Sequence, residues 1–173
     1  PQTLTEIGKS AFNECTKLTS LSLPDGIVSI GEGAFASCKS LRSVHIPDSV
    51  SSISEFAFSR CEALEQIQLP AHLTAIQDGT FGWCTSLTSI QIPNEVCSNG
   101  RSAFRNCNKL REVQLPAGLT TLEEQAFHTC TSLTHIELPS QLTTLPEGIF
   151  KGCTHLCSIQ LPDSVTTIAS SAF

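Results

Sequence analysis

The chain has 173 residues, of which 40% are hydrophobic and 15% charged, and this composition excludes a disordered polar chain. Its formal net charge of −6 argues against a nucleic-acid-binding protein, because such proteins usually carry a basic face. No apolar run reaches the ~18 residues that a membrane helix needs, so we expect no membrane insertion by this segment.

Three residue types recur at one fixed spacing of 23 residues. They are Pro1, Pro24, Pro47, Pro70, Pro93, Pro116, Pro139 and Pro162; Phe12, Phe35, Phe58, Phe81, Phe104, Phe127, Phe150 and Phe173; and Cys15, Cys38, Cys61, Cys84, Cys107, Cys130 and Cys153. The spacing predicts a single solenoid over 1–173, with seven full units and a half unit. A unit of this length cannot bury its own apolar side chains, whereas stacked units cover one another.

Each unit has the pattern P-x-x-V-x-x-I-x-x-x-A-F-x-x-C-x-x-L-x-x-I-x-L. After the Pro, Val50 and Ile53 are typical of an inward-facing arm, and Ala57-Phe58-x-x-Cys61 predicts a turn or a single helical turn on the convex side. The final alternating segment predicts a short strand. These strands are expected at 21–23, 44–46, 67–69, 90–92, 113–115, 136–138 and 159–161. They would lie parallel in a sheet on the concave face, each ended by a Pro that lacks an N–H.

The A-F-x-x-C-x-x-L-x-x-I-x-L-P-x-x-V pattern closely resembles the BspA-like, or treponemal-type, leucine-rich repeats over the whole chain. The resemblance implies an α/β repeat solenoid of the leucine-rich-repeat type. It also implies a cell-surface or secreted protein, with an intracellular location left open, and a role in adhesion or protein binding. The family offers no shared catalytic residue, so we expect neither an enzyme nor a cofactor.

The seven Cys in register predict a column of buried, reduced thiols, because their side chains point the same way rather than at each other. Cys97 and Cys157 lie outside the register and are expected to be exposed free thiols. Cys153, His155 and Cys157 resemble a metal cluster in spacing, but the first Cys belongs to the buried column. Zinc needs ligands that converge tetrahedrally, so no metal site is expected.

The outward strand positions are the candidate contact residues of the concave face. They are Arg42, His45, Glu65, Gln68, Gln91, Arg111, Glu112, Gln114, His135, Glu137 and Gln160. Two interpretations stay open: a solvated sheet face with stacked Gln amides, or a face that binds a partner.

Three residues break the repeat pattern elsewhere. Phe56 and Trp83 replace small or polar residues on the convex side, in adjacent units. They either form an exposed contact patch or cover each other and nearby Phe rings. Asn99 replaces an inward aliphatic residue, so it must find hydrogen bonds or turn outward, and 97–100 is interpreted as a locally loosened turn.

The leading hypothesis is a non-catalytic interaction or adhesion module that presents its concave sheet to a protein or glycan partner. The alternative is a structural scaffold or spacer within a larger assembly. Because neither end carries a polar cap, we also expect the chain to be a segment of a longer protein, flanked by further repeats or domains.

Overall fold

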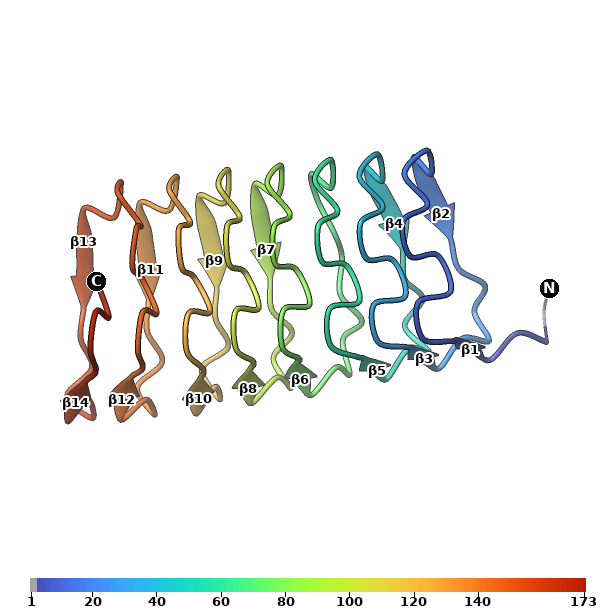
Figure 1. Ribbon diagram of the computed structural model, residues 1–173. Coiled ribbons are helices and arrows are strands. Elements are labelled where there is room, and N and C mark those ends of the chain that lie inside the picture. The colour runs from blue at the N-terminus through green and yellow to red at the C-terminus, as the bar shows by residue number, and fades with distance from the viewer. Residues whose placement is uncertain (1–2) are drawn as a thin grey trace.

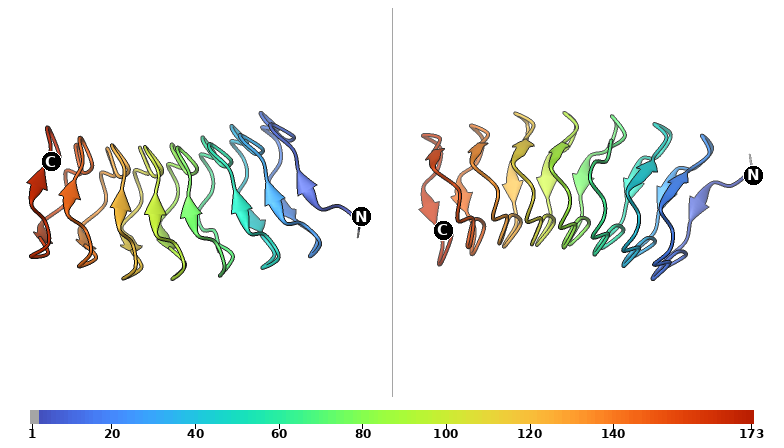
Figure 2. Two further views of the ribbon diagram at one scale, coloured as in Figure 1. Left: turned by 90° about the horizontal axis from the view of Figure 1, so that it is seen from below. Right: turned by 90° about the horizontal axis from the view of Figure 1, so that it is seen from above.

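The computed structural model describes residues 3–173; Pro1, the first member of the Pro column, lies outside the described residues. The chain forms a row of similar coils stacked along one axis (Figure 1), and Figure 2 shows the same succession from two further sides. All strand pairs are parallel and join residues 23 apart in the sequence. The predicted fold class, a repeat solenoid of parallel strands, is confirmed.

The strands fall into two columns. Three-residue strands form the first column: β2 (Ser20–Ser22), β4 (Ser43–His45), β7 (Ser89–Gln91), β9 (Glu112–Gln114), β11 (His135–Glu137) and β13 (Ser158–Gln160). Two-residue strands form the second: β1 (Glu6–Ile7), β3 (Ser29–Ile30), β5 (Ser52–Ile53), β6 (Ala75–Ile76), β8 (Ser98–Asn99), β10 (Thr121–Leu122), β12 (Thr144–Leu145) and β14 (Thr167–Ile168). The first column is the face that the sequence predicts to be concave, and we call it the sheet face.

The third side of each coil consists of turns, and residues 3–173 contain no helix. Two positions per unit have a left-handed backbone, as at Phe56 (φ 57°) and Arg60 (φ 59°). A right-handed helical turn cannot pass through such residues, so the alternative of single helical turns is wrong. We call this side, 54–61 and its equivalents, the turn face.

The core consists of columns that run the length of the stack. Neighbouring Phe rings lie nearly parallel between Phe12 and Phe150, with centroids 5.2 to 5.8 Å apart. The Cys column contains no disulfide, and five of its thiols, from Cys38 to Cys130, are fully buried. Cys15 is exposed and Cys153 only half-buried, because they lie near the ends of the stack. The prediction of a reduced, buried thiol column is confirmed for its interior.

Polar side chains also connect equivalent positions of neighbouring units. Thr120 Oγ1 donates to the Cys97 carbonyl oxygen over 3.2 Å, and several Ser and Thr hydroxyls repeat this pattern. Ion pairs follow it as well, such as Lys9 with Glu32 at 2.8 Å. Because both partners are 23 residues apart, these contacts favour one register of stacking.

Both strand columns are interrupted, which the sequence pattern does not indicate. The second column divides between β5 and β6 and between β10 and β12. Pro146 explains the second division, because it stands where Gly100 and Ala169 donate an N–H to the preceding unit. On the sheet face, residues 66–68 form no strand, so the predicted strand at 67–69 is absent. Nothing in the structure explains that gap.

Asn99 is part of a regular strand. β8 pairs with both β6 and β10, so the interpretation of 97–100 as a loosened turn is wrong. The Asn99 side chain is only 2% exposed, and neither its Oδ1 nor its Nδ2 has a hydrogen-bond partner. The ladder on both sides holds the backbone in place, and the inward side chain has no room to turn out.

Candidate functional site

The sheet face owes its polarity to strand alternation. In β4, β7, β9 and β11 the central residue is buried and both flanking residues are exposed. The buried residues are aliphatic and join the core, as Val44 and Ile90 do. The flanking residues form polar columns, because equivalent strands pair in register where they pair, as β2 does with β4, β7 with β9 and β11 with β13. All eleven predicted contact residues lie on this face and are exposed.

Few of these side chains have partners on the protein itself. Arg42 Nη1 lies 3.6 Å from Glu65 Oε1, and His135 Nε2 lies 3.8 Å from Glu137 Oε1 on the same strand. Gln91 and Gln114 are register partners. No hydrogen bond joins the amides of the Gln column in the described part of the chain, so the interpretation as hydrogen-bonded stacked amides is not supported. These amides are therefore available to another molecule.

The largest depression on the sheet face, about 740 Å³, lies at the interruption of the strand column. It extends from 66–69 to 89–95 and includes the side chains of Gln66, Gln68 and Gln91. A second depression of about 450 Å³ lies between Glu112, Gln114, His135 and Glu137. The sequence did not indicate the contributions of Asn94 and Glu95, because only the structure shows that the strand ladder opens there.

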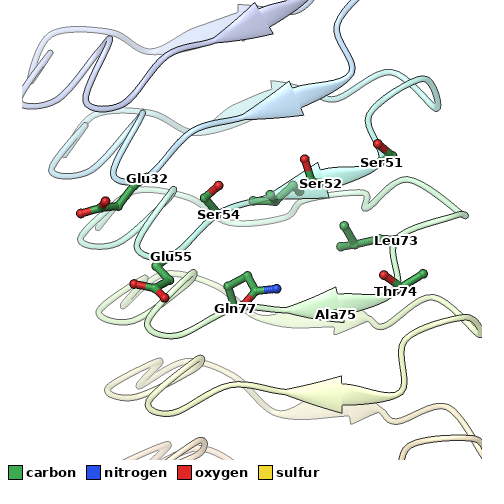
Figure 3. A pocket seen from close by; sticks show the side chains of 10 residues that line it. Glu32, Ser51, Ser52, Ser54, Glu55, Leu73, Thr74, Ala75 and Gln77 are labelled. Atoms are coloured by element: carbon green, nitrogen blue, oxygen red, sulfur yellow. The ribbon is translucent and has the colours of Figure 1, made fainter.

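A third depression of about 360 Å³ lies in the second strand column, where β5 and β6 are not paired (Figure 3). Hydroxyls of Ser51, Ser52 and Thr74 lie along it, with Glu32 and Glu55 at one end. Among residues 3–173, no group of three or more His, Cys, Asp and Glu side chains could hold a metal ion, here or elsewhere.

Cys153, His155 and Cys157 do not converge. Cys153 Sγ donates to the Phe127 carbonyl oxygen over 3.1 Å, and Cys157 Sγ donates to the His155 carbonyl oxygen over 3.2 Å. His155 Nδ1 lies 2.6 Å from the carbonyl oxygen of Thr131. Each group thus contacts the backbone rather than a common point.

The buried thiols are poor nucleophiles. Burial raises the pKa of Cys84 to about 12 and that of Cys153 to about 11. The thiolate is the reactive form of cysteine, so the interior of the column is chemically inert. Cys97 and Cys157 are exposed, as predicted.

On the turn face, Phe56 and Trp83 do not stack on each other. Phe56 is 43% exposed, and its ring lies against Gly79 of the next unit. Trp83 is half-buried between two guanidinium groups, with Arg60 Cζ 5.1 Å and Arg105 Cζ 5.5 Å from the ring centroid. The interpretation that the two aromatics cover each other is therefore wrong.

No helix among residues 3–173 is long and apolar enough to cross a membrane.

Comparisons with known proteins agree with this architecture. The family described as "BspA type Leucine rich repeat region" matches residues 1–96 and 74–173 in six copies. A leucine-rich repeat protein from Bacteroides ovatus is 36% identical, with a TM-score of 0.87 over 89% of this chain and 42% of that protein. The chain thus spans less than half the length of that relative. A leucine-rich repeat protein from T. pallidum is 33% identical, with a TM-score of 0.82 over 94% of this chain and 76% of that one. Curated proteins gave no match.

Proposed function

Because the chain belongs to the BspA-type leucine-rich repeat family, we propose that it is a non-catalytic interaction module whose sheet face binds a protein or glycan partner. The proposal includes an adhesion role at the cell surface or in a secreted protein. Members of this family are generally interaction or scaffold modules, and repeat proteins commonly bind through such extended faces.

One observation supports the sheet face above all: its polar side chains are exposed and mostly unpaired. Gln68, Gln91 and Gln114 have no side-chain partner among the described residues, and an amide can both donate and accept hydrogen bonds. Arg111 and Glu112 are consecutive in the sequence, are both exposed and add one charge of each sign. Such a surface suits a polar partner, and the opening at 66–68 gives it a recessed centre of about 740 Å³.

An array of glycans and extracellular proteins, probed with the labelled chain, tests the proposal. The test variant is Arg111→Gln with Glu112→Gln, which removes one cation and one anion from the sheet face. The control variant is Lys109→Gln with Glu123→Gln, which makes the same change in net charge at exposed positions elsewhere.

We expect at least one molecule on the array to bind the natural chain and the control variant. The same molecule should not bind the variant Arg111→Gln with Glu112→Gln. Circular dichroism should show unchanged unfolding of both variants, since exposed substitutions usually change stability by less than about 0.5 kcal/mol. If no binding depends on the sheet face, the scaffold alternative takes its place.

A further inference from the structure

The turn face carries cations that have no counterion. Arg60, Arg105 and Lys151 each lack a carboxylate oxygen within 4.0 Å among the described residues. Four other cations, Lys9, Lys39, Arg42 and Arg101, pair with the carboxylate one unit further along the chain, whereas Lys17, Lys109 and Arg111 are also unpaired among the described residues. Three of the six unpaired Lys and Arg side chains thus lie on the turn face of a protein whose net charge is −6. We call the residues Arg60, Trp83, Arg105, His128 and Lys151 the cationic strip.

At one end of the cationic strip, the indole of Trp83 packs against two guanidinium groups. The guanidinium groups of Arg60, from the preceding unit, and Arg105, from the following unit, both lie over the indole ring. Arg105 Nη1 also donates to Gln125 Oε1. Cation–π contacts of this kind fix the planes of both guanidinium groups without neutralising their charge. The guanidinium groups of Arg60 and Arg105 are therefore held in fixed orientations in which they can bind an anion.

The other end of the strip is a column. Arg105, His128 and Lys151 occupy the same position in three successive units, whose Phe rings are 5.4 and 5.8 Å apart. His128 lies between the two cations, and its Nδ1 lies 2.6 Å from Thr129 Oγ1. Burial, Arg105 and Lys151 together lower the pKa of His128. An anion bound at the column would oppose that effect and favour the imidazolium.

The backbone beneath the aromatics is strained. Phe56 and Trp83 have φ values of 57° and 61°, and their positions hold glycine in other units, such as Gly79 and Gly152. A bulky side chain in this conformation costs about 1–2 kcal/mol relative to glycine. The same conformation recurs at these two positions in the other units, where Ser, Asn, Gln and Thr residues adopt it too, so it belongs to the repeat rather than to the two aromatics.

From this arrangement we infer that the cationic strip, together with Phe56, binds an extended acidic segment of a partner protein. Guanidinium forks match carboxylates in a bidentate way, and the strip holds two forks and an ammonium in a row. The exposed Phe56 ring, four residues before Arg60, offers a contact for an apolar side chain of the same segment. A peptide can present both chemistries, whereas a sulfated polysaccharide presents only the anions. The nearby carboxylates of Glu62 and Glu124 are engaged by Lys39 and Arg101.

The chain contains its own reporter for this site. Trp83 is the only Trp and there is no Tyr, so indole fluorescence reports on the strip alone. The ligand is a short synthetic peptide of glutamates interrupted by single leucines. We expect a saturable change in Trp83 emission that weakens as salt increases, since exposed charge pairs are screened.

Variants distinguish the strip from a general charge effect. Arg60→Gln, Arg105→Gln and Lys151→Gln combined should weaken peptide binding about tenfold or more, which corresponds to about 1.4 kcal/mol. The matched control neutralises three cations outside the sheet face and the cationic strip, with Lys9→Gln, Lys17→Gln and Lys109→Gln, and should bind as the natural chain does. His128 should show a higher pKa in the peptide complex when its ring protons are followed by NMR.

Three results would overturn the inference. The first is equal binding by the strip variant and the control, and the second is no response of Trp83 to the peptide. The third is tighter binding of a sulfated oligosaccharide of equal charge than of the peptide. The sheet-face variant Arg111→Gln with Glu112→Gln should leave peptide binding unchanged, so the two proposed surfaces succeed or fail separately.

Discussion

The Sγ of Cys61 donates a hydrogen bond to the carbonyl oxygen of Phe35, one unit earlier in the stack, over 3.2 Å. The same oxygen accepts the N–H of Cys38. This arrangement repeats along the column, from Cys38 with Phe12 to Cys153 with Phe127. The repeated Cys is therefore more than a small apolar residue, because its thiol gives a carbonyl oxygen of the neighbouring unit a second hydrogen bond.

Removing one interior thiol should destabilise the stack. Cys84→Ala deletes a fully buried sulfur and its hydrogen bond, and we expect it to lower the free energy of unfolding by about 1–2 kcal/mol. Urea denaturation followed by circular dichroism measures the change. Cys157→Ala, at an exposed thiol, should change it by less than about 0.5 kcal/mol. Equal effects of the two substitutions would contradict a structural role for the column.

The thiol column should make the protein sensitive to alkali. Burial raises the pKa of Cys84 from 9.0 to about 12 and that of Cys153 to about 11, so both stay neutral in the folded chain where unfolded thiols ionise. The unfolded state then binds fewer protons, and stability falls as pH rises above 9. The loss is about 1.4 kcal/mol per pH unit for each such thiol, over a range that ends near its folded pKa. Urea midpoints across this range test the slope, and Cys84→Ala should make it shallower. A midpoint that does not change above pH 9 would contradict the account.

Replacing the buried Asn99 should stabilise the fold. Asn99→Leu removes two unsatisfied polar atoms and matches the aliphatic neighbours Ile76 and Leu122 in the column. We expect a gain of about 1–3 kcal/mol in the free energy of unfolding. The exposed Asn94→Leu serves as a control and should show no such gain. A lower urea midpoint for Asn99→Leu would mean that the amide makes contacts that this structure does not contain.

Gly79 should tolerate a side chain less well than its equivalent Gly33. Both have a left-handed backbone, with φ values of 58° and 59°. A Cβ on Gly79 would collide with Cε1 and Cδ1 of the Phe56 ring, whereas a Cβ on Gly33 would find its nearest neighbour, Ser10 Oγ, at 3.6 Å. We expect Gly33→Ala to cost about 1 kcal/mol through its backbone alone and Gly79→Ala to cost more.

The variant Phe56→Ser tests the source of that difference. In its background, Gly79→Ala should cost no more than Gly33→Ala does, since the ring that crowds the new methyl group is gone. If the excess persists in thermal unfolding experiments, Phe56 is not the cause.

The period of 23 residues was enough to predict the stacking, the parallel strands and the buried columns. When units of equal length stack, residues at equivalent positions lie next to one another. It was not enough for contacts between different positions of neighbouring units. Arg60 occupies the same position as Trp83 one unit earlier, but Arg105 belongs to a different position of the next unit, and its contact with the Trp83 ring depends on side-chain directions that the period does not encode. The left-handed turns did leave a signal, since Gly33, Gly79 and Gly148 share one position, and that pattern favours a turn over a helix. The gap at 66–68 left no signal that we can identify.

The most direct test of the central claim is the dissociation constant of a partner found on the array, measured for the natural chain and for Arg111→Gln with Glu112→Gln. The account predicts binding at least about tenfold weaker for this variant, with an unchanged unfolding midpoint and no loss for Lys109→Gln with Glu123→Gln. Equal dissociation constants for all three proteins would contradict the claim that the sheet face is the binding surface.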